Sequence, residues 1–278
     1  AEKRRAQPVA IDGILDLTDW DFEKDGTVEL GGQWRFVWEE FVQPMPSAVF
    51  RERYKGTMAL PAGWAGAPHP EVEGEFLPGQ GYATYALEIR LPESAKSREL
   101  GIAVRDVTSA ARWFITPLDS SVLLGQMHNG TPGSSLETTI PVWLEASTPL
   151  IPDESGSLMV LVHASNFHHA RGGAWYSPML GEQHSVAQLE KSAHTLNVTV
   201  FGICLIIALY HLVLFLQRRE DTPSLFFAFL CGQTALRQWM TAHLSQTVGL
   251  GLSQEGFEML VALEYITMPL MAMSYGLF

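Results

Sequence analysis

The residues best suited to binding chemistry lie in one short segment, NFHHARGGAWY at positions 166–176. Aromatic side chains pack against the apolar faces of sugar rings, while planar polar groups bind hydroxyl groups. The residues that predict a ligand-binding loop are His168, His169, Arg171, Trp175 and Tyr176. The alternative is a structural loop, in which Gly172 and Gly173 supply positive φ angles and Trp175 packs on the edge of the fold.

Two further tryptophans, Trp64 and Trp113, are candidates for contact with the same ligand. Large aromatic side chains are also ordinary constituents of β-sandwich cores, so both residues have a structural alternative. The pair Trp34 and Trp38 is assigned to the core.

Other chemistries fit the sequence poorly. His163, His168 and His169 could imitate a metal site, but no carboxylate or cysteine at a matching spacing completes one, and adjacent histidines on a strand point to opposite faces. Nucleophile elbows, phosphate-binding glycine loops and dinucleotide fingerprints are absent from the sequence. The sequence therefore predicts no catalytic residues, no metal and no cofactor.

Several stretches before residue 185 alternate apolar and polar side chains, as strands with one buried face do. The apolar residues that share a face within each stretch are Trp34, Phe36 and Trp38; Ala83, Tyr85, Leu87, Ile89 and Leu91; Leu100, Ile102 and Val104; and Leu158, Val160 and Val162. This pattern predicts an all-β sandwich. From Ser185 the apolar spacing becomes helical, which predicts a helical connector over 185–195.

Three apolar stretches follow, at 196–216, 223–241 and 258–278. The first contains 21 residues without a formal charge, and at about 1.5 Å per residue it can cross a hydrocarbon core of roughly 30 Å as a helix. We therefore expect three transmembrane helices in the lipid bilayer.

Basic residues orient such helices, because short loops rich in Lys and Arg stay on the cytoplasmic side. Arg218 and Arg219 lie in the loop 217–222, whereas Lys191 is the only basic residue between Gly172 and Thr195. This bias puts the N-terminal domain outside the cytoplasm. Together with the resemblance given below, it implies an inner (plasma) membrane location with the N-terminal domain in the periplasm. An exported domain needs a signal peptide, so we expect that one preceded Ala1.

Charge excludes one class of partner. Residues 1–195 contain 15 Lys and Arg against 25 Asp and Glu, a formal charge of −10, which argues against a nucleic acid. Both cysteines, Cys204 and Cys231, fall in predicted membrane helices, so no disulfide can stabilise the soluble part.

An ordered series of motifs resembles the sugar-binding jelly-roll domain of family 2 glycosidases: LGGQWRF (30–36), LPAGW (60–64), GYATYALEIRLP (81–92), RDVTSAARWFI (105–115) and NFHHARGGAWYSPML (166–180). With GTPGSSLETTIPVW (130–143) and the junction ALYHLVLFLQRRE (208–220), the series resembles bacterial seven-transmembrane receptors with diverse intracellular signalling modules, in their second type of extracellular domain. The resemblance implies a galactose-binding-domain-like jelly roll over 1–184, followed after the connector by the first three helices of a transmembrane bundle over 196–278.

The resemblance also implies a function. The chain would be the sensory fragment of a signalling receptor that binds a carbohydrate or similar small ligand outside the membrane, and it would have no catalysis of its own. A cytoplasmic signalling domain would follow in the full-length chain, and a homodimer is left open. The alternative is a membrane-tethered adhesion or assembly module that binds a protein partner. A ligand pocket at 168–176 would favour the receptor, and a flat apolar patch would favour the module.

Two ionisable residues fall inside the predicted bundle, where charge is costly. Arg237 and Glu264 lie at similar depths in the second and third helices, which predicts an ion pair between them. Alternatively, Arg237 extends to the interface and Glu264 faces other helices.

Overall fold

The computed structural model describes residues 5–105, 107, 109–142, 145–242, 244 and 254–277. The chain divides into two compact units, Ala1–Gln188 and Leu189–Phe278. The first is built of β-strands and the second of helices.

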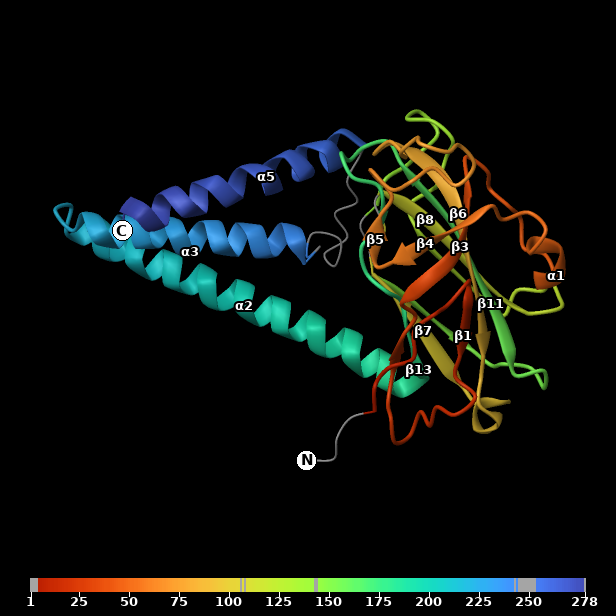
Figure 1. The fold of residues 1–278 in the computed structure, drawn as a ribbon. Coiled ribbons are helices and arrows are strands. Elements are labelled where there is room, and N and C mark those ends of the chain that lie inside the picture. Colours follow the sequence, from red (N-terminus) through yellow and green to blue (C-terminus); the bar gives the residue numbers. More distant parts are fainter. Residues whose placement is uncertain are drawn as a thin grey trace. The chain divides into compact units, whose positions relative to one another are not determined.

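Two mainly antiparallel sheets make up most of the first unit (Figure 1). The strand order of the larger sheet is β4 (Gly56–Leu60), β3 (Gly32–Trp38), β6 (Gly81–Arg90), β11 (Ser157–Asn166), β8 (Ala110–Pro117) and β9 (Gly125–Asn129), and β1 (Ile14–Asp16) pairs in parallel with β6. The order of the smaller sheet is β10 (Ala146–Leu150), β7 (Leu100–Val104), β13 (Met179–Glu182) and β2 (Val28–Glu29). A third, two-stranded sheet joins β5 (Ala62–Gly63) to β12 (Gly173–Ala174), and the short helices are α1 (Ser47–Phe50) and η1 (Glu93–Ala95).

The main hydrophobic core lies between the two sheets. Trp34 and Phe36 on β3 and Tyr85 and Leu87 on β6 belong to it, and so does Ile102 on β7. The β-sandwich predicted from the alternating pattern is therefore confirmed, because the residues predicted to share a face enter this core. Trp34 and Trp38 are core residues, as predicted.

The other face of the larger sheet carries a second, smaller core. Side chains from the strands, among them Val37, Phe114 and Leu161, pack under Val42 and Phe50 from the segment 39–55 that contains α1. The sequence analysis missed this covering segment. Polar residues that alternate with the main core also face this side, including Glu88 between Leu87 and Ile89.

His163 is one of these residues, and it gives a testable pH dependence. Its ring packs against Phe41 and Phe114, with a centroid distance of 4.9 Å in each pair. Its Nε2 lies 2.7 Å from the carbonyl oxygen of Val42. Burial lowers the pKa of His163. In the unfolded chain the pKa of a histidine is about 6.5, so below that pH the unfolded chain binds a proton more readily than the folded chain. The free energy of unfolding should therefore fall as the pH drops through about 6.5.

Thermal unfolding followed by near-ultraviolet circular dichroism checks this expectation. The variant His163→Phe keeps an aromatic ring against Phe41 and Phe114 but cannot titrate, so its unfolding temperature should depend less on pH below about 6.5. An equally steep dependence in the variant would contradict the assignment to His163.

The second unit contains α2, α3 and α5. Helix α2 (Gln183–Gln217) is continuous across the division at residues 188 and 189 and begins two residues before the predicted connector. Helices α3 (Thr222–Thr241) and α5 (Gln254–Leu277) contain the other two predicted spans, except for Phe278, which lies outside the described residues. By length and apolar content, two described segments, Gln183–Gln217 and Gly256–Gly276, could cross a membrane. Helix α3 does not meet the same criterion, so a three-helix membrane bundle stays a prediction.

Candidate functional site

The segment between β11 and β13 is held against the strand β5 by the backbone. Gly173 pairs with Gly63 and Ala174 with Ala62, and the N–H of Trp64 donates to the carbonyl oxygen of Gly172 (2.9 Å). A Cβ atom on Gly172 would lie 2.3 Å from Cε2 of Trp64. Glycine is therefore required where this loop crosses the buried indole.

A network of hydrogen bonds fixes the start of the loop. Nδ2 of Asn166 donates to the carbonyl oxygens of Gly79 (2.8 Å) and His169 (2.7 Å), and Nε1 of Trp64 also donates to Gly79 (3.1 Å). In return, the N–H of His169 donates to Oδ1 of Asn166 (3.1 Å). These hydrogen bonds hold the start of the loop in one conformation.

The buried side chain of His169 contacts Arg171 and Trp175. It is only 8% exposed, and its Nδ1 accepts a hydrogen bond from the backbone N–H of Arg171 (3.1 Å). Its ring meets Trp175 edge to face, with centroids 5.3 Å apart. His169 therefore helps to position Arg171 and Trp175.

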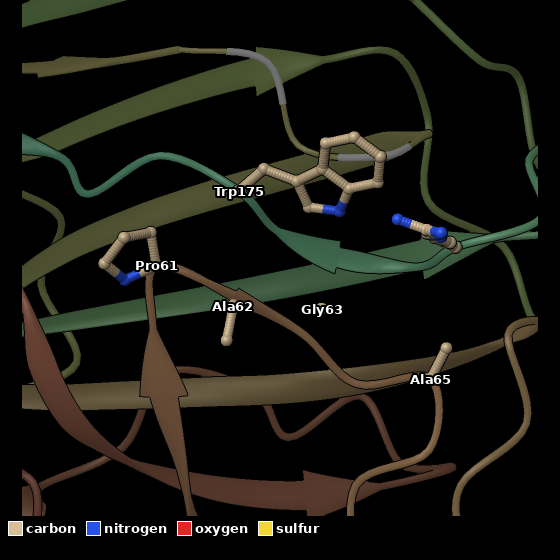
Figure 2. A pocket seen from close by; sticks show the side chains of 6 residues that line it. Pro61, Ala62, Gly63, Ala65 and Trp175 are labelled. Carbon is tan, nitrogen blue, oxygen red and sulfur yellow. The ribbon is translucent and has the colours of Figure 1, made fainter.

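A pocket of about 440 Å³ lies between this loop and β5. Its lining residues are Pro61, Ala62, Gly63, Ala65, Arg171 and Trp175. Figure 2 shows the indole of Trp175 beside the strand that carries Ala62 and Gly63. A Cβ atom on Gly63 would crowd the backbone of the loop, because it would lie 3.1 Å from the carbonyl oxygen of Gly172.

The pocket combines an aromatic surface, small apolar residues and one charged group. Trp175 is 40% exposed, and Arg171 is exposed as well. An indole can stack on the apolar face of a ring, and a guanidinium can donate several hydrogen bonds to polar substituents. The volume falls in the range of small-molecule sites.

Three predicted residues of the loop do not line the pocket: His169, His168 and Tyr176. A ring nitrogen of the half-buried His168 lies 3.1 Å from the carbonyl oxygen of Thr139. The ring of Tyr176 carries the guanidinium of Arg105, whose Cζ lies 3.8 Å from the ring centroid. His168 and Tyr176 are therefore close to the pocket residues in sequence, but their side chains contact Thr139 and Arg105 instead.

The sequence analysis placed Trp64 and Trp113 among the ligand contacts, and the structure corrects this. Trp64 is 0% exposed and Trp113 is 1% exposed. Nε1 of Trp113 donates to the buried Oδ1 of Asn129 (3.2 Å). Neither indole presents a face to a ligand, because both faces are packed in the core.

Four pocket residues were not predicted: Pro61, Ala62, Gly63 and Ala65. They belong to a stretch that forms a strand of only two residues, too short to leave a periodic signal in the sequence. Among the described residues, no group of three or more His, Cys, Asp or Glu is arranged to hold a metal ion.

In the helical unit, Arg237 and Glu264 are paired. Nη2 of Arg237 lies 3.5 Å from Oε1 of Glu264, and Nη1 donates to the Glu264 carbonyl oxygen (3.1 Å) and to Oγ1 of Thr267 (3.2 Å). One guanidinium thus joins α3 to α5 by three contacts.

Comparison with known proteins gives distant structural matches only. The sequence matches no protein-family model and no curated protein. Among solved structures, the chain is similar to a GH2 β-galacturonidase from Eisenbergiella tayi, with 15% identity over 56% of this chain and 24% of that one and a TM-score of 0.35. It is also similar to a putative β-galactosidase from Bacteroides fragilis, with 15% identity, coverage of 55% and 22%, and a TM-score of 0.36.

A third similar structure is the β-glucuronidase of Ruminococcus gnavus, with 11% identity, coverage of 55% and 28%, and a TM-score of 0.37. The chain spans about a quarter of the length of these structures. The prediction that the chain has no catalysis of its own is contradicted by these matches, because the structures are of glycoside hydrolases. Identities of 15% or less do not show an enzymatic activity either.

Proposed function

We propose that the β-sandwich is the extracytoplasmic sensor of a bacterial transmembrane signalling receptor and binds a carbohydrate or a similar small ligand. The observation that carries the proposal is the exposed indole of Trp175 on the pocket beside β5. A concave site with an aromatic face and a convergent guanidinium favours a small ligand over a protein surface. We also propose that the sandwich is a jelly roll of the galactose-binding-domain-like kind.

The membrane part of the proposal is supported by two apolar helical segments. Arg218 and Arg219 follow α2 directly, and short basic loops stay in the cytoplasm. We place the protein in the inner membrane with the β-sandwich in the periplasm. The partner would be a cytoplasmic signalling domain of the full-length receptor, as the resemblance to seven-transmembrane receptors implies.

The test is the loss of ring stacking in Trp175→Ala. Stacking on an aromatic ring contributes about 1 kcal/mol, so the affinity for a bound sugar should fall about fivefold or more. Trp175→Phe should retain most of the affinity, because it keeps an aromatic face. Calorimetric titration of the whole chain in detergent with a panel of mono- and oligosaccharides measures both.

Tyr176→Ala is the matched control. Tyr176 is also 40% exposed and follows Trp175 directly, but it does not line the pocket. Its removal should leave the affinity unchanged. The proposal fails if no sugar binds, or if the Tyr176 variant loses as much affinity as the Trp175 variant.

A further inference from the structure

Of the described residues that line the pocket, only Arg171 is charged. Among the residues that the structure describes, its guanidinium has no ion-pair partner and no hydrogen-bond partner. The backbone around Arg171 is fixed by two hydrogen bonds. The N–H of Arg171 donates to Nδ1 of His169 (3.1 Å), and the carbonyl oxygen of Gly172 accepts from the N–H of Trp64 (2.9 Å). The backbone that carries Arg171 is therefore fixed, and its side chain lines the same pocket as the indole of Trp175.

Unpaired arginines are unusual in this unit, where acidic residues are in excess. Of its described arginines, all but Arg112 and Arg171 form ion pairs. Examples are Arg98 with Glu23 and Arg105 with Glu145. An arginine that meets no carboxylate here, yet lines a pocket, is available to a charged ligand.

The physical chemistry of the guanidinium indicates which ligand fits. Its planar fork of N–H donors matches the oxygens of a carboxylate or a phosphate, and such charge-assisted hydrogen bonds are stronger than neutral ones. The formal charge of −10 over residues 1–195 disfavours anions at long range. Selection of an anion would therefore depend on direct contact with Arg171.

We propose that this pocket selects sugars that carry a negatively charged group, with the ring on Trp175 and the anionic substituent on Arg171. This inference rests on the proposed function and names the ligand class of the same site. The anionic group of such a sugar can be either a carboxylate or a phosphate, and both can bind a guanidinium.

Calorimetric titration of the whole chain in detergent with glucose, glucuronate and a glucose monophosphate tests the inference. At least one of the anionic sugars should bind about tenfold more tightly than glucose, and the difference between the two identifies the preferred anion. Arg171→Gln should remove this preference, so that the variant binds neither anionic sugar more tightly than it binds glucose. Arg112→Gln is the matched control, because Arg112 is exposed and unpaired but lies outside the pocket, and it should keep the preference.

The outcomes separate this inference from the proposed function. If glucose binds as tightly as both anionic sugars, or if Arg171→Gln weakens all three alike, selection by charge is wrong and sugar binding stands. If no sugar binds, the proposed function fails and the inference fails with it. Equal loss of preference in the Arg112 variant would also overturn the role of Arg171.

Discussion

Replacing Glu88 by Gln is expected to lower the free energy of unfolding of the β-sandwich by about 3–5 kcal/mol, since it leaves buried positive charge without a counter-charge. Oε2 of Glu88 lies 3.6 Å from Nη1 of Arg35, and both side chains are 2% exposed. The same oxygen accepts hydrogen bonds from Arg51 and from the Ser47 hydroxyl (3.1 Å). Arg90 completes the group, with Nε 3.7 Å from Oε1.

The pKa of Glu88 fixes the pH range of this stabilisation. Burial alone would raise the pKa, but the hydrogen bond and charge of Arg51, the Ser47 hydroxyl and the charge of Arg35 together hold it below its ordinary value of 4.5. The unfolded chain binds the proton more readily than the folded chain. The contribution of Glu88 is therefore complete above pH 4.5 and is lost as the pH falls through the folded-state pKa.

Chemical denaturation of wild type and variants measures the effect. The matched control is Glu40→Gln, which breaks an exposed ion pair between Glu40 and Arg53 (2.7 Å, side chains 48% and 51% exposed). Exposed pairs of this kind contribute less than about 1 kcal/mol. Equal losses in the two variants would show that the group around Glu88 is not a stabilising centre.

In the full-length form of the receptor that we propose, inserting Gly-Gly after Lys191 is expected to abolish signalling while ligand affinity stays nearly intact. The insertion point lies inside α2, which is helical without a break from Gln183 to Gln217. Two extra residues rotate the helix beyond them by about 200°, and two glycines also weaken it. Rotation or displacement of the β-sandwich could then no longer be passed along one rigid element.

Reporter output and ligand affinity of the same receptor give the measurement. An insertion of four alanines is the control, since it preserves the helix and shifts the facing residues by only about 40°, and it should retain part of the output. Because affinity and output are linked, any dependence of affinity on the signalling state should vanish in the Gly-Gly receptor. A normal dose response in that receptor would rule out α2 as the rigid connection.

Much of the sandwich was predictable because a strand with one buried face has apolar residues at every second position. Trp34, Phe36 and Trp38 alternate with polar residues, and the structure places all three in one core. The covering segment with Phe50 and the buried charge of Arg35 left no such signal, since a residue type alone does not say which face of a sheet a loop will cover. The helical spans were predictable from apolar content.

The candidate site was only half predictable. Arg171 and Trp175 could be named from the chemistry of their side chains, but the opposite wall comes from residues a hundred positions earlier, joined by the pairing of Gly63 with Gly173. The error at Trp64 and Trp113 has a related cause. An indole stacks equally well on a ligand or in a core, and only the folded chain decides which surface surrounds it.

The exposure of the tryptophans has an optical consequence. Of the described tryptophans, Trp20, Trp34, Trp38, Trp64 and Trp113 are buried, Trp239 is partly buried, and Trp175 alone is exposed. A collisional quencher such as acrylamide reaches exposed indoles first, so among the described tryptophans the pocket residue Trp175 should be quenched most readily. The protein therefore carries its own unlabelled reporter of pocket occupancy, which a bound ring would shield from the quencher.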